Sequence, residues 1–449
     1  MVTEIATKQN LYREAYNALQ ASAAGDQPSW LRQLRENAFA RFEELGFPSV
    51  KDEEWKYTNV AAIAKAEFLP SVSDQVSRRE TVASEHPEFG SPETLASQLI
   101  FVNGKLQTDL SSVAGLPAGV VAIGLSQAIA DERYAEIVRS NLARHADYVA
   151  NGFTALNTGL ISHGAFIYIP RGITVDQPIQ IAFITDGEHL SAASFPRVLV
   201  VAEENSSATF VESYSSTGDS VYFTNAVIEI VLKDGARLEH YKVQRESQSA
   251  FHIATTQADL GPNSSYDSTT ITFGAQLSRH DYGVTMDHEG VECWVDGLYL
   301  VTAGQHTDTH SVIDHRKPHC TSHQLYKGIL DGKSRAVFNG KVFVRHDAQK
   351  TDAMQTNKNL LLSNEARVDT KPQLEILADD VKCAHGAAVG QIDEDELFYL
   401  ATRGIHPDLA RNLLTYGFAE EVIGKIKVES IRAELDEAVL NRLNARLEA

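Results

Sequence analysis

Hydrophobic positions follow two different periods along this chain, and the period changes twice. Over residues 1–150 apolar side chains recur at steps of three and four, which is the spacing of an amphipathic helix. From about residue 160 they alternate with polar side chains, which is the spacing of a half-buried strand. Helical spacing returns near residue 392. We therefore expect a mostly helical region with a short hairpin over 1–150, a β core over 151–391 and a helical domain over 392–449.

The amino-terminal region contains one strongly marked helix, over residues 30–45. Ser29 is placed to cap this helix, and Gly46 followed by Phe47-Pro48 is placed to end it. Weaker patterns predict a helix over 51–68, a polar linker over 71–94, a hairpin around Asn103-Gly104 over 99–109, and a helix over 136–149.

Short runs rich in β-branched and aromatic residues fill the central region and predict a long series of strands in one unit. That pattern is typical of a sandwich, a barrel or a solenoid. A weak repeat favours the solenoid, because a polar turn residue is followed by a small and then an apolar residue at spacings near multiples of about fifteen. The repeat begins at Asn205, Gly235, Asn263, Gly290, Gly332, Asn364 and Asp380. Turn residues of any β protein can produce a false period, so the other two folds stay open.

The carboxy-terminal region predicts three helices. Asp393 is placed to cap the first, Glu396 completes a capping box, and Gly404 ends the helix. The second helix begins at Pro407, and the last carries an apolar stripe with charges between its members. Such helices either cover the end of a solenoid or offer a docking face to another protein.

Composition restricts the partners of the chain. Lys and Arg number 40 and Asp and Glu number 60, and the resulting net charge of −20 disfavours nucleic acids and anionic membrane surfaces. The amino terminus lacks a secretory pattern, and no apolar run reaches the roughly 18 residues that span a bilayer. Three cysteines, Cys293, Cys320 and Cys383, cannot all pair within the chain, which favours a reducing compartment. We expect a cytoplasmic protein with no nucleic-acid or membrane partner.

The most informative chemical pattern is the pair Cys383 and His385, two residues apart. On a strand this spacing places both side chains on one face, with Val381 beside them. A thiolate and an imidazole suit iron, zinc or copper(I) better than magnesium or calcium. Two ligands do not complete a four-coordinate site, so the remaining ligands have to come from elsewhere in the fold, from a second chain or from the cargo. A buried free cysteine beside a hydrogen-bonded histidine is the alternative interpretation.

Two further patterns are weaker. Five histidines surround Cys320, yet HExxH, CxxC and the two-histidine-one-carboxylate pattern are missing, and solvent-facing histidines explain the run equally well. These histidines are His306, His310, His315, His319 and His323. Residues 328–334 imitate a phosphate-binding loop, but they have one residue too few between their glycines and no helix follows them. The sequence therefore gives no support to a nucleotide-binding, acyl-transfer or dinucleotide enzyme.

The run over 315–405 resembles the SufB/SufD family of iron–sulfur cluster assembly proteins, and its SufD branch closely. The resemblance is carried by HRKPHCTSHQLYKGILDGKSRAVFNGKVFVRHDAQKTDAMQTNKNLLLSNEARVDTKPQLEILADDVKCAHGAAVGQI, by the upstream ALNTGLISHGAFIYIPRGI and by the amino-terminal GFPSVKDEEWKYTNV. Together these stretches span nearly the whole chain. SufB has an acidic residue after the histidine, whereas Gly386 follows His385 here.

This resemblance implies a right-handed parallel β-helix between two helical regions. It also implies two partners: SufB, which pairs through the β-helix, and the ATPase SufC, which binds the carboxy-terminal helices. His385, and secondarily Cys383, would then be metal ligands near the SufB interface, for a transient iron–sulfur cluster or iron ion shared with SufB. The chain itself would be a non-catalytic scaffold with no tightly bound cofactor. A homodimer in the absence of SufB is compatible with the same surface.

Other function classes compete with this interpretation. A β-helix enzyme that cleaves acidic polysaccharides would use Asp, Lys and Arg on one ladder, but such proteins are secreted and the free thiols disfavour it. A histidine-rich metal-binding β protein would hold one ferrous ion within a single chain. A purely structural role, in which the chain only shapes SufB, is also compatible with the sequence.

Overall fold

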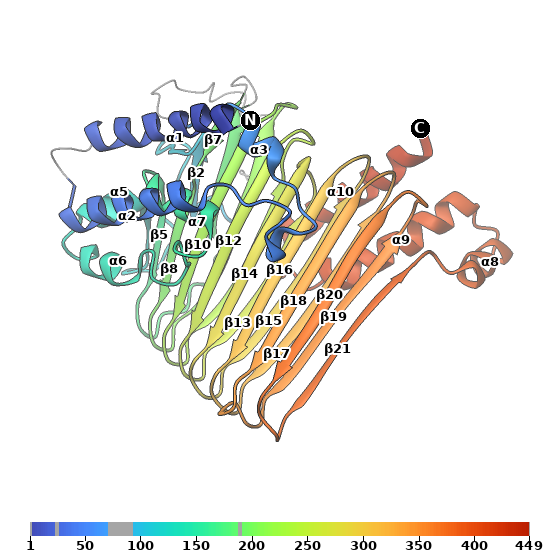
Figure 1. Cartoon of the computed structure of the whole chain (residues 1–449). Helices are drawn as coiled ribbons and strands as arrows, with labels where there is room; N and C mark the ends of the chain where they lie inside the picture. The colour runs from blue at the N-terminus through green and yellow to red at the C-terminus, as the bar shows by residue number, and fades with distance from the viewer. Residues whose placement is uncertain (1, 23–26, 71–92, 187–190, 449) are drawn as a thin grey trace.

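The computed structural model of the chain describes residues 2–22, 27–70, 93–186 and 191–448. A β-solenoid of about seven turns forms the body of the molecule (Figure 1). It contains two long sheets whose strands alternate along the chain, so that each turn contributes one strand to each sheet. The main hydrophobic core fills the interior between the sheets. Helices from both ends of the chain pack against the outer faces.

The strands of the two sheets follow in spatial order from the last turn of the solenoid to the first. Sheet A contains β20 (Arg367–Ile376), β18 (Arg335–Val344), β16 (His306–His315), β14 (Leu277–Met286), β12 (Phe251–Leu260), β10 (Phe223–Leu232), β8 (Arg197–Ala202), β5 (Gly164–Ile169) and β4 (Val121–Gly124). Sheet B contains β21 (Lys382–Gly390), β19 (Asp352–Leu361), β17 (Thr321–Leu330), β15 (Glu292–Val301), β13 (Ser265–Thr272), β11 (Arg237–Arg245), β9 (Ser207–Thr217), β6 (Ile179–Asp186), β2 (Gln98–Val102) and β3 (Lys105–Leu106). Two short strands extend sheet A: β7 (Ala192–Ser194) pairs with β10, and β1 (Leu69–Pro70) pairs with β7.

Successive turns pair in parallel, with an offset of one full turn. Phe223 pairs with Phe251, an offset of 28 residues, and Arg335 pairs with Arg367, an offset of 32 residues. Each full turn therefore contains two of the units of about fifteen residues that the sequence predicts, one for each strand and its connection. Equivalent side chains stack in ladders as a result.

Five of the seven predicted turn residues have a left-handed backbone, with φ between 51° and 71°. They are Asn205, Gly235, Asn263, Gly290 and Gly332. At Gly235 the close approach of the preceding turn is a second constraint, since a Cβ there would lie 2.5 Å from Asn205 Oδ1.

Amino-terminal helices gather at the first turns of the solenoid and cover part of the outer face of sheet A (Figure 1). They are α1 (Val2–Ser22), α2 (Ser29–Leu45), α3 (Ala61–Lys65), α5 (Leu125–Ala130), α6 (Ala135–Asn141) and α7 (Gly152–Gly159), with one 3-10 turn, η1 (Glu53–Trp55). At this end both sheets finish in antiparallel pairs, β2 with β3 and β4 with β5. The first turn is thus closed by the chain itself.

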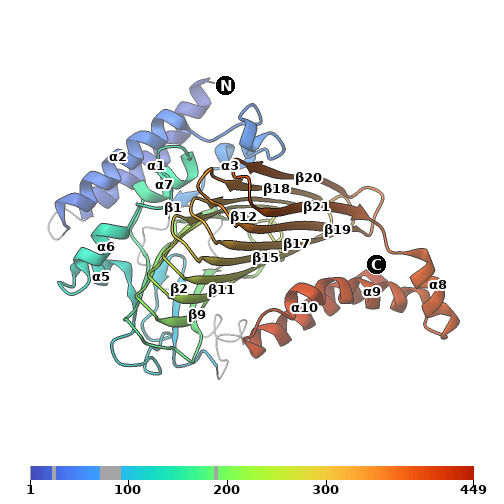
Figure 2. The ribbon, with the colours of Figure 1, turned by 90° about the horizontal axis from the view of Figure 1, so that it is seen from below.

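Of the three carboxy-terminal helices, the second and third lie along the outer face of sheet B, whereas the first projects beyond the solenoid and contacts the second (Figure 2). The three helices are α8 (Glu394–Thr402), α9 (Pro407–Ile423) and α10 (Glu429–Glu448). The apolar stripe predicted for the last helix is buried against sheet B through Val428, Ile431, Leu435, Val439 and Leu443. The alternative that these helices cover the end of the solenoid is therefore wrong: they cover a face, and the side chains of β21 stay largely exposed.

Several predicted elements agree with the structure and several differ. The hairpin around Asn103-Gly104 and the cap of α8 by Asp393 are confirmed. Ser29 does not cap α2, because it is the first helical residue and Pro28 takes the cap position without a side-chain bond. Helices α1, α5 and α7 were not predicted. The linker expected over 71–94 lies outside the described residues except for its last two positions.

Two predicted helices are shorter than expected. The pattern over 51–68 gives only η1 and α3, because residues between them are fixed by contacts with the solenoid; Thr58 Oγ1 donates to Asp308 Oδ2 over 2.5 Å. The pattern over 136–149 gives only α6, and Ala143 has a positive φ of 56° soon after the helix ends.

The segment after α6 is held by a fully buried ion pair on the outer face of sheet A. Arg197 Nη2 lies 2.5 Å from Glu229 Oε2, and neither side chain is exposed. Glu229 also accepts hydrogen bonds from the backbone N–H groups of Ala143, His145 and Ala146, over 2.8, 2.9 and 3.1 Å. Burial opposes ionisation, but Arg197 and the three N–H groups together hold the pKa of Glu229 below its ordinary value. The pair therefore joins the amino-terminal region to the solenoid.

Replacement of Arg197 by Met is expected to lower the free energy of unfolding by about 3–5 kcal/mol, because it leaves the Glu229 carboxylate buried without its counter-ion. Chemical denaturation followed by circular dichroism measures the change. Arg171→Met is the matched control, since Arg171 forms an ion pair with Glu204 in which both side chains are well exposed. Its loss is expected to stay within about 1 kcal/mol. Equal effects of the two substitutions would contradict the role of the buried pair.

Candidate functional site

Cys383 and His385 lie on β21, the terminal strand of sheet B at the far end of the solenoid (Figure 1). Cys383 is half-buried and packs against the interior core. His385 is exposed, because no further turn of the described chain follows β21. Burial raises the pKa of the Cys383 thiol above its ordinary value. The pair thus faces the open end of the solenoid from its inner side, and neither side chain is sealed in the interior.

An inward-facing ladder of polar side chains runs from His385 into the solenoid. His385 pairs with Gln355 of β19, and Gln355 pairs with Gln324 of β17. Gln355 Nε2 donates to Gln324 Oε1 over 2.8 Å, and Gln324 Nε2 donates to Ser311 Oγ of β16 over 2.9 Å. The neighbouring ladder contains Cys383 and Cys293, which is fully buried. These two cysteines therefore occupy equivalent positions in different turns of the solenoid.

Earlier turns of the solenoid enclose a cluster of fully buried ionisable groups. Glu212 Oε1 lies 3.1 Å from His240 Nε2, and His252 Nδ1 lies 2.7 Å from Glu246 Oε2. Lys242 Nζ lies 2.9 Å from His252 Nε2. Burial lowers the pKa of Lys242, against the opposing effect of the two carboxylates. Charges buried at this density cost stability unless they are mutually paired, and here each carboxylate has a cationic or histidine partner.

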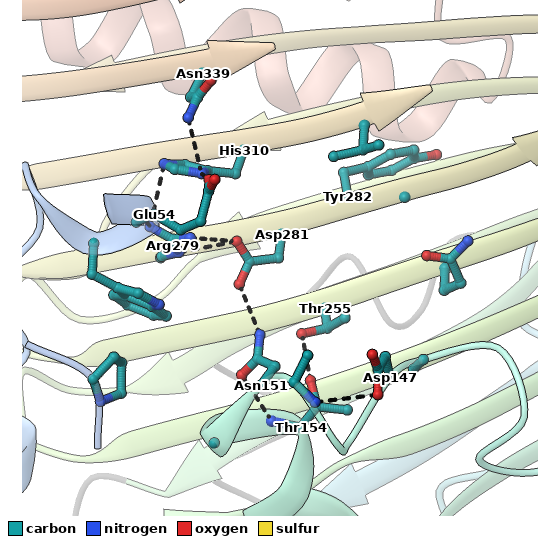
Figure 3. A pocket seen from close by; sticks show the side chains of 18 of the residues that line it. Glu54, Asp147, Asn151, Thr154, Thr255, Arg279, Asp281, Tyr282, His310 and Asn339 are labelled. Atoms are coloured by element: carbon teal, nitrogen blue, oxygen red, sulfur yellow. Dashed lines mark hydrogen bonds and ion pairs between the residues drawn. The ribbon is translucent and has the colours of Figure 1, made fainter. Parts of the chain in front are cut away.

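A groove of about 800 Å³ separates the outer face of sheet A from amino-terminal segments near residues 45–55 and 146–154 (Figure 3). Arg279 of β14 lies in its wall, with ion pairs to Asp281 at 2.7 Å and Asp308 at 2.8 Å. The guanidinium also lies 3.7 Å from the ring centre of Trp55, a close cation–π contact. Arg279 is therefore fully paired within the groove.

His310 joins the two walls of this groove (Figure 3). Its Nδ1 lies 3.3 Å from Glu54 and its Nε2 lies 3.1 Å from Asp308. Burial lowers the pKa of His310, but the two carboxylates outweigh it and hold the pKa above its ordinary value of 6.5. The hydrogen bond from His310 is the largest cause that lowers the pKa of Glu54 to about 2. His310 therefore links η1 to sheet A through its ion pair with Glu54, while its ion pair with Asp308 lies within β16.

The histidine run that the sequence singled out does not converge on one point. His306 and His310 face the amino-terminal segment, where His306 Nε2 lies 2.8 Å from Thr58 Oγ1. His315 is buried, 2.8 Å from Ser322 Oγ, and His323 stacks on Trp294. His319 occupies a turn with a φ of 59°. Among the residues that the structure describes, no three His, Cys, Asp or Glu side chains form a group that could hold a metal ion.

Comparisons with known proteins agree with this architecture. The family model for the SUF system FeS cluster assembly, SufBD core domain, matches residues 183–418, and the model for the SufBD protein N-terminal region matches residues 6–181. An iron-sulfur cluster assembly SufBD family protein of Synechocystis sp. is 35% identical over 94% of this chain and 93% of its own length. The iron-sulfur cluster assembly protein SufD of Escherichia coli is 32% identical over 90% of both chains, and that of Bacillus subtilis is 28% identical over 91% of this chain and 93% of its own. This chain belongs to the SufBD family.

Membership of the SufBD family supports a role in iron–sulfur cluster assembly, and the chain is homologous to SufD proteins. Sequence reasoning did not find two features of this SufBD protein. One is the ladder formed by His385, Gln355 and Gln324, which we call the amide ladder, and the other is the cluster of buried ionisable groups around Lys242. A signal for the cluster was present, because strict alternation places Glu212 on the same inward face as Ala208 and Phe210. No comparable signal marks the groove, since its two walls come from segments far apart in the chain.

Replacement of His310 by Gln is expected to lower the free energy of unfolding by about 1 kcal/mol near pH 6, because Glu54 is half-exposed and solvent weakens its ion pair. The lowered pKa of Glu54 stabilises the fold above pH 4.5, and this contribution is lost as the pH falls towards 2. The raised pKa of His310 stabilises the fold below pH 6.5, and this contribution is lost as the pH rises through the folded pKa. The difference between wild type and variant should therefore be largest between about pH 4.5 and 6.5.

The free energy of unfolding, measured by denaturation at several pH values, tests the ion pairs of His310. His346→Gln is the control. His346 forms an ion pair with Asp347 in which both side chains are highly exposed, so its replacement should change stability little at any pH. A difference for His310→Gln that does not depend on pH would contradict the charge pairing.

Proposed function

We propose that this chain is a non-catalytic scaffold subunit of the iron–sulfur cluster assembly machinery, which pairs with SufB through the open end of its solenoid. The observation that carries the proposal is the position of Cys383 and His385, on the inner side of an unpaired terminal strand. The nascent cluster, which is the cargo of the machinery and not a resident cofactor, would be held there between the two subunits.

The end of the solenoid has the properties of a protein interface. Strands β20 and β21 are terminal in their sheets, so each leaves one row of backbone N–H and C=O groups free for a strand of another chain. Three apolar side chains near this edge are exposed by 40%, 62% and 47%: Ile376, Leu377 and Val389. An exposed apolar edge of this kind favours pairing with a partner. A second copy of this chain is the alternative occupant when SufB is absent.

Both candidate ligands are suited to iron or to a nascent cluster. A neutral imidazole binds a metal through a ring nitrogen without losing a proton, whereas a thiol has to ionise first. The raised pKa of Cys383 means that iron binding there would release a proton at neutral pH. His385 is therefore the stronger candidate and Cys383 the secondary one. SufB would supply the remaining ligands, because two side chains do not complete a four-coordinate site.

The carboxy-terminal helices support a second interface, for the ATPase SufC. One side of α9 and of α10 is buried against sheet B. On α8 and on the other side of α9, four large apolar side chains are exposed by 71%, 57%, 51% and 46%: Phe398, Tyr399, Leu409 and Leu413. Aromatic and aliphatic side chains of this kind act as anchors in protein interfaces. ATP hydrolysis would belong to the partner and would move this subunit through α8 and α9.

None of the described helices is apolar over a length sufficient to cross a bilayer. The net charge of −20 and three unpaired cysteines, of which two are buried, support a location in the cytoplasm.

Replacement of His385 by Ala is expected to lower the cluster content of the complex with SufB and SufC by about 10-fold or more, since loss of a ligand costs at least as much as loss of an outer-shell partner. The complex is purified without oxygen, and its iron and sulfide content and visible absorbance are measured. Cys383→Ala should have a smaller effect. His346→Ala, an exposed histidine outside β21 that forms an ion pair with Asp347, is the control. Unchanged cluster content in an intact His385→Ala complex would refute the assignment.

Replacement of Leu413 by Asp is expected to weaken SufC binding by about 2 kcal/mol or more, because it places a charge in the centre of an apolar contact. The side chain is exposed, so the fold should be unaffected. Leu440→Asp, an equally exposed position on α10, is the control. Calorimetric titration with SufC compares the two variants, and equal affinities would remove α9 from the interface.

A further inference from the structure

We propose that Gln355 is the positioning residue of His385: its side-chain oxygen accepts a hydrogen bond from one imidazole nitrogen, which leaves the other nitrogen free to bind iron. The proposal rests on the proposed function, because it explains how this chain orients its principal candidate ligand. It assigns a role to a buried residue that neither the interior core nor the ion pairs of the solenoid require.

Ladder geometry places the two side chains together. Gln355 and His385 are direct partners in the parallel pairing of β19 with β21. Both lie on the inward face, since Cys383 and its partner Ala353, two residues earlier on each strand, pack in the interior core. Paired strands are about 4.8 Å apart, so a side chain at one rung reaches the next.

The orientation of the Gln355 amide is set from the interior side. Its Nε2 donates to Gln324 Oε1 over 2.8 Å, and Gln324 is held in turn by Ser311. Gly340 on the opposite sheet gives the amide its space, since a Cβ there would lie 2.3 Å from Gln355 Nε2. Because the nitrogen is turned towards Gln324, the oxygen on the same carbon is turned away from that rung.

Gln355 Oε1 has no hydrogen-bond partner among the described residues, although the residue is only 1% exposed. An unpaired carbonyl oxygen at such a position costs about 1–3 kcal/mol. His385 stands at the next rung and is exposed, so its ring can turn to supply the missing donor. The last acceptor of the amide ladder, Gln355 Oε1, therefore lies on the strand next to His385, the candidate metal ligand.

The hydrogen-bonding properties of the two side chains favour a hydrogen bond from the His385 imidazole to the Gln355 amide oxygen. A carboxamide oxygen can only accept, so the ring nitrogen that faces it has to carry the proton. In a neutral imidazole the other nitrogen then presents its lone pair, which is the form that binds a metal. Metal-binding histidines commonly donate their second N–H to a carbonyl or carboxylate, and loss of that partner costs 10–100-fold in metal affinity.

The tautomer of His385 tests the proposal without reference to cluster formation. Full-length protein is labelled with ¹⁵N-histidine, long-range ¹H–¹⁵N correlation spectra report the tautomer, and the His385 signals are assigned by their loss in His385→Ala. We expect one dominant tautomer in the wild type and a mixture of the two in Gln355→Leu, which removes the acceptor. Gln355→Glu, which keeps an oxygen acceptor at this rung but replaces the donor to Gln324 by a second acceptor, should favour a hydrogen-bonded imidazole over the mixture of tautomers.

A matched control is Gln373→Leu, the same substitution on the outward face of β20 in the last turn. It should leave the His385 signals unchanged. If Gln355→Leu also leaves the tautomer ratio unchanged, a buried water satisfies the amide oxygen and the proposal is wrong.

Iron binding provides the second measurement. In the assembled complex, Gln355→Leu is expected to weaken ferrous ion binding by about 10–100-fold, and Gln355→Glu by less. If His385→Ala leaves both iron binding and cluster content intact, the proposed function fails, whereas the tautomer spectra still decide whether Gln355 orients the ring. The two hypotheses are therefore refuted by different results.

Discussion

Parallel pairing between one turn and the next is the constraint on which the rest of this structure depends. Every strand of a solenoid needs a neighbouring turn on each side to satisfy its backbone N–H and C=O groups. At the first turn the chain meets this need itself, with the antiparallel pairs of β2 with β3 and of β4 with β5, and with helices on the outer face. At the last turn it does not, because the carboxy-terminal helices pack on the face of sheet B. The open edge at β20 and β21 follows from this asymmetry, and it is where Cys383 and His385 lie.

The buried polar side chains inside the solenoid change from charged to neutral towards that open end. Middle turns bury charged groups, with Lys242 between the carboxylates of Glu212 and Glu246. Later turns bury neutral amides and hydroxyls, and one of these amides, Gln355, pairs directly with His385 of β21. A charged group directly beneath a metal ligand would impose its own field on a site that also has to accept ligands from a partner. Neutral amides orient the histidine without adding charge, so the metal would meet a field set mainly by its own ligands.

Much of the fold could be predicted from the sequence, because a solenoid repeats a local pattern. Turn residues such as Gly235 and Asn263 adopt the left-handed conformation that their chemistry favours, and their spacing favoured the solenoid that the structure shows. Predictions failed where a distant contact decides the structure: the helix expected to reach residue 149 ends at Asn141, and the next residues give their N–H groups to Glu229. Cys383 and His385 were found because both lie on one strand. Gln355 was not, since its role depends on register between strands about thirty residues apart.

The same register limits which positions in this fold can bind a shared metal. Inward-facing residues of earlier turns, such as Cys293, are enclosed by the turns on both sides, and burial raises the pKa of the Cys293 thiol above its ordinary range. Outward-facing residues of sheet B are covered in part by α9 and α10. Among the described residues, the inward faces of the terminal strands β20 and β21 are open to another chain, and β21 carries Cys383 and His385. If the proposed ligands bind iron, the half-buried Cys383 would have to lose a proton first, whereas an imidazole binds a metal through a ring nitrogen without losing one.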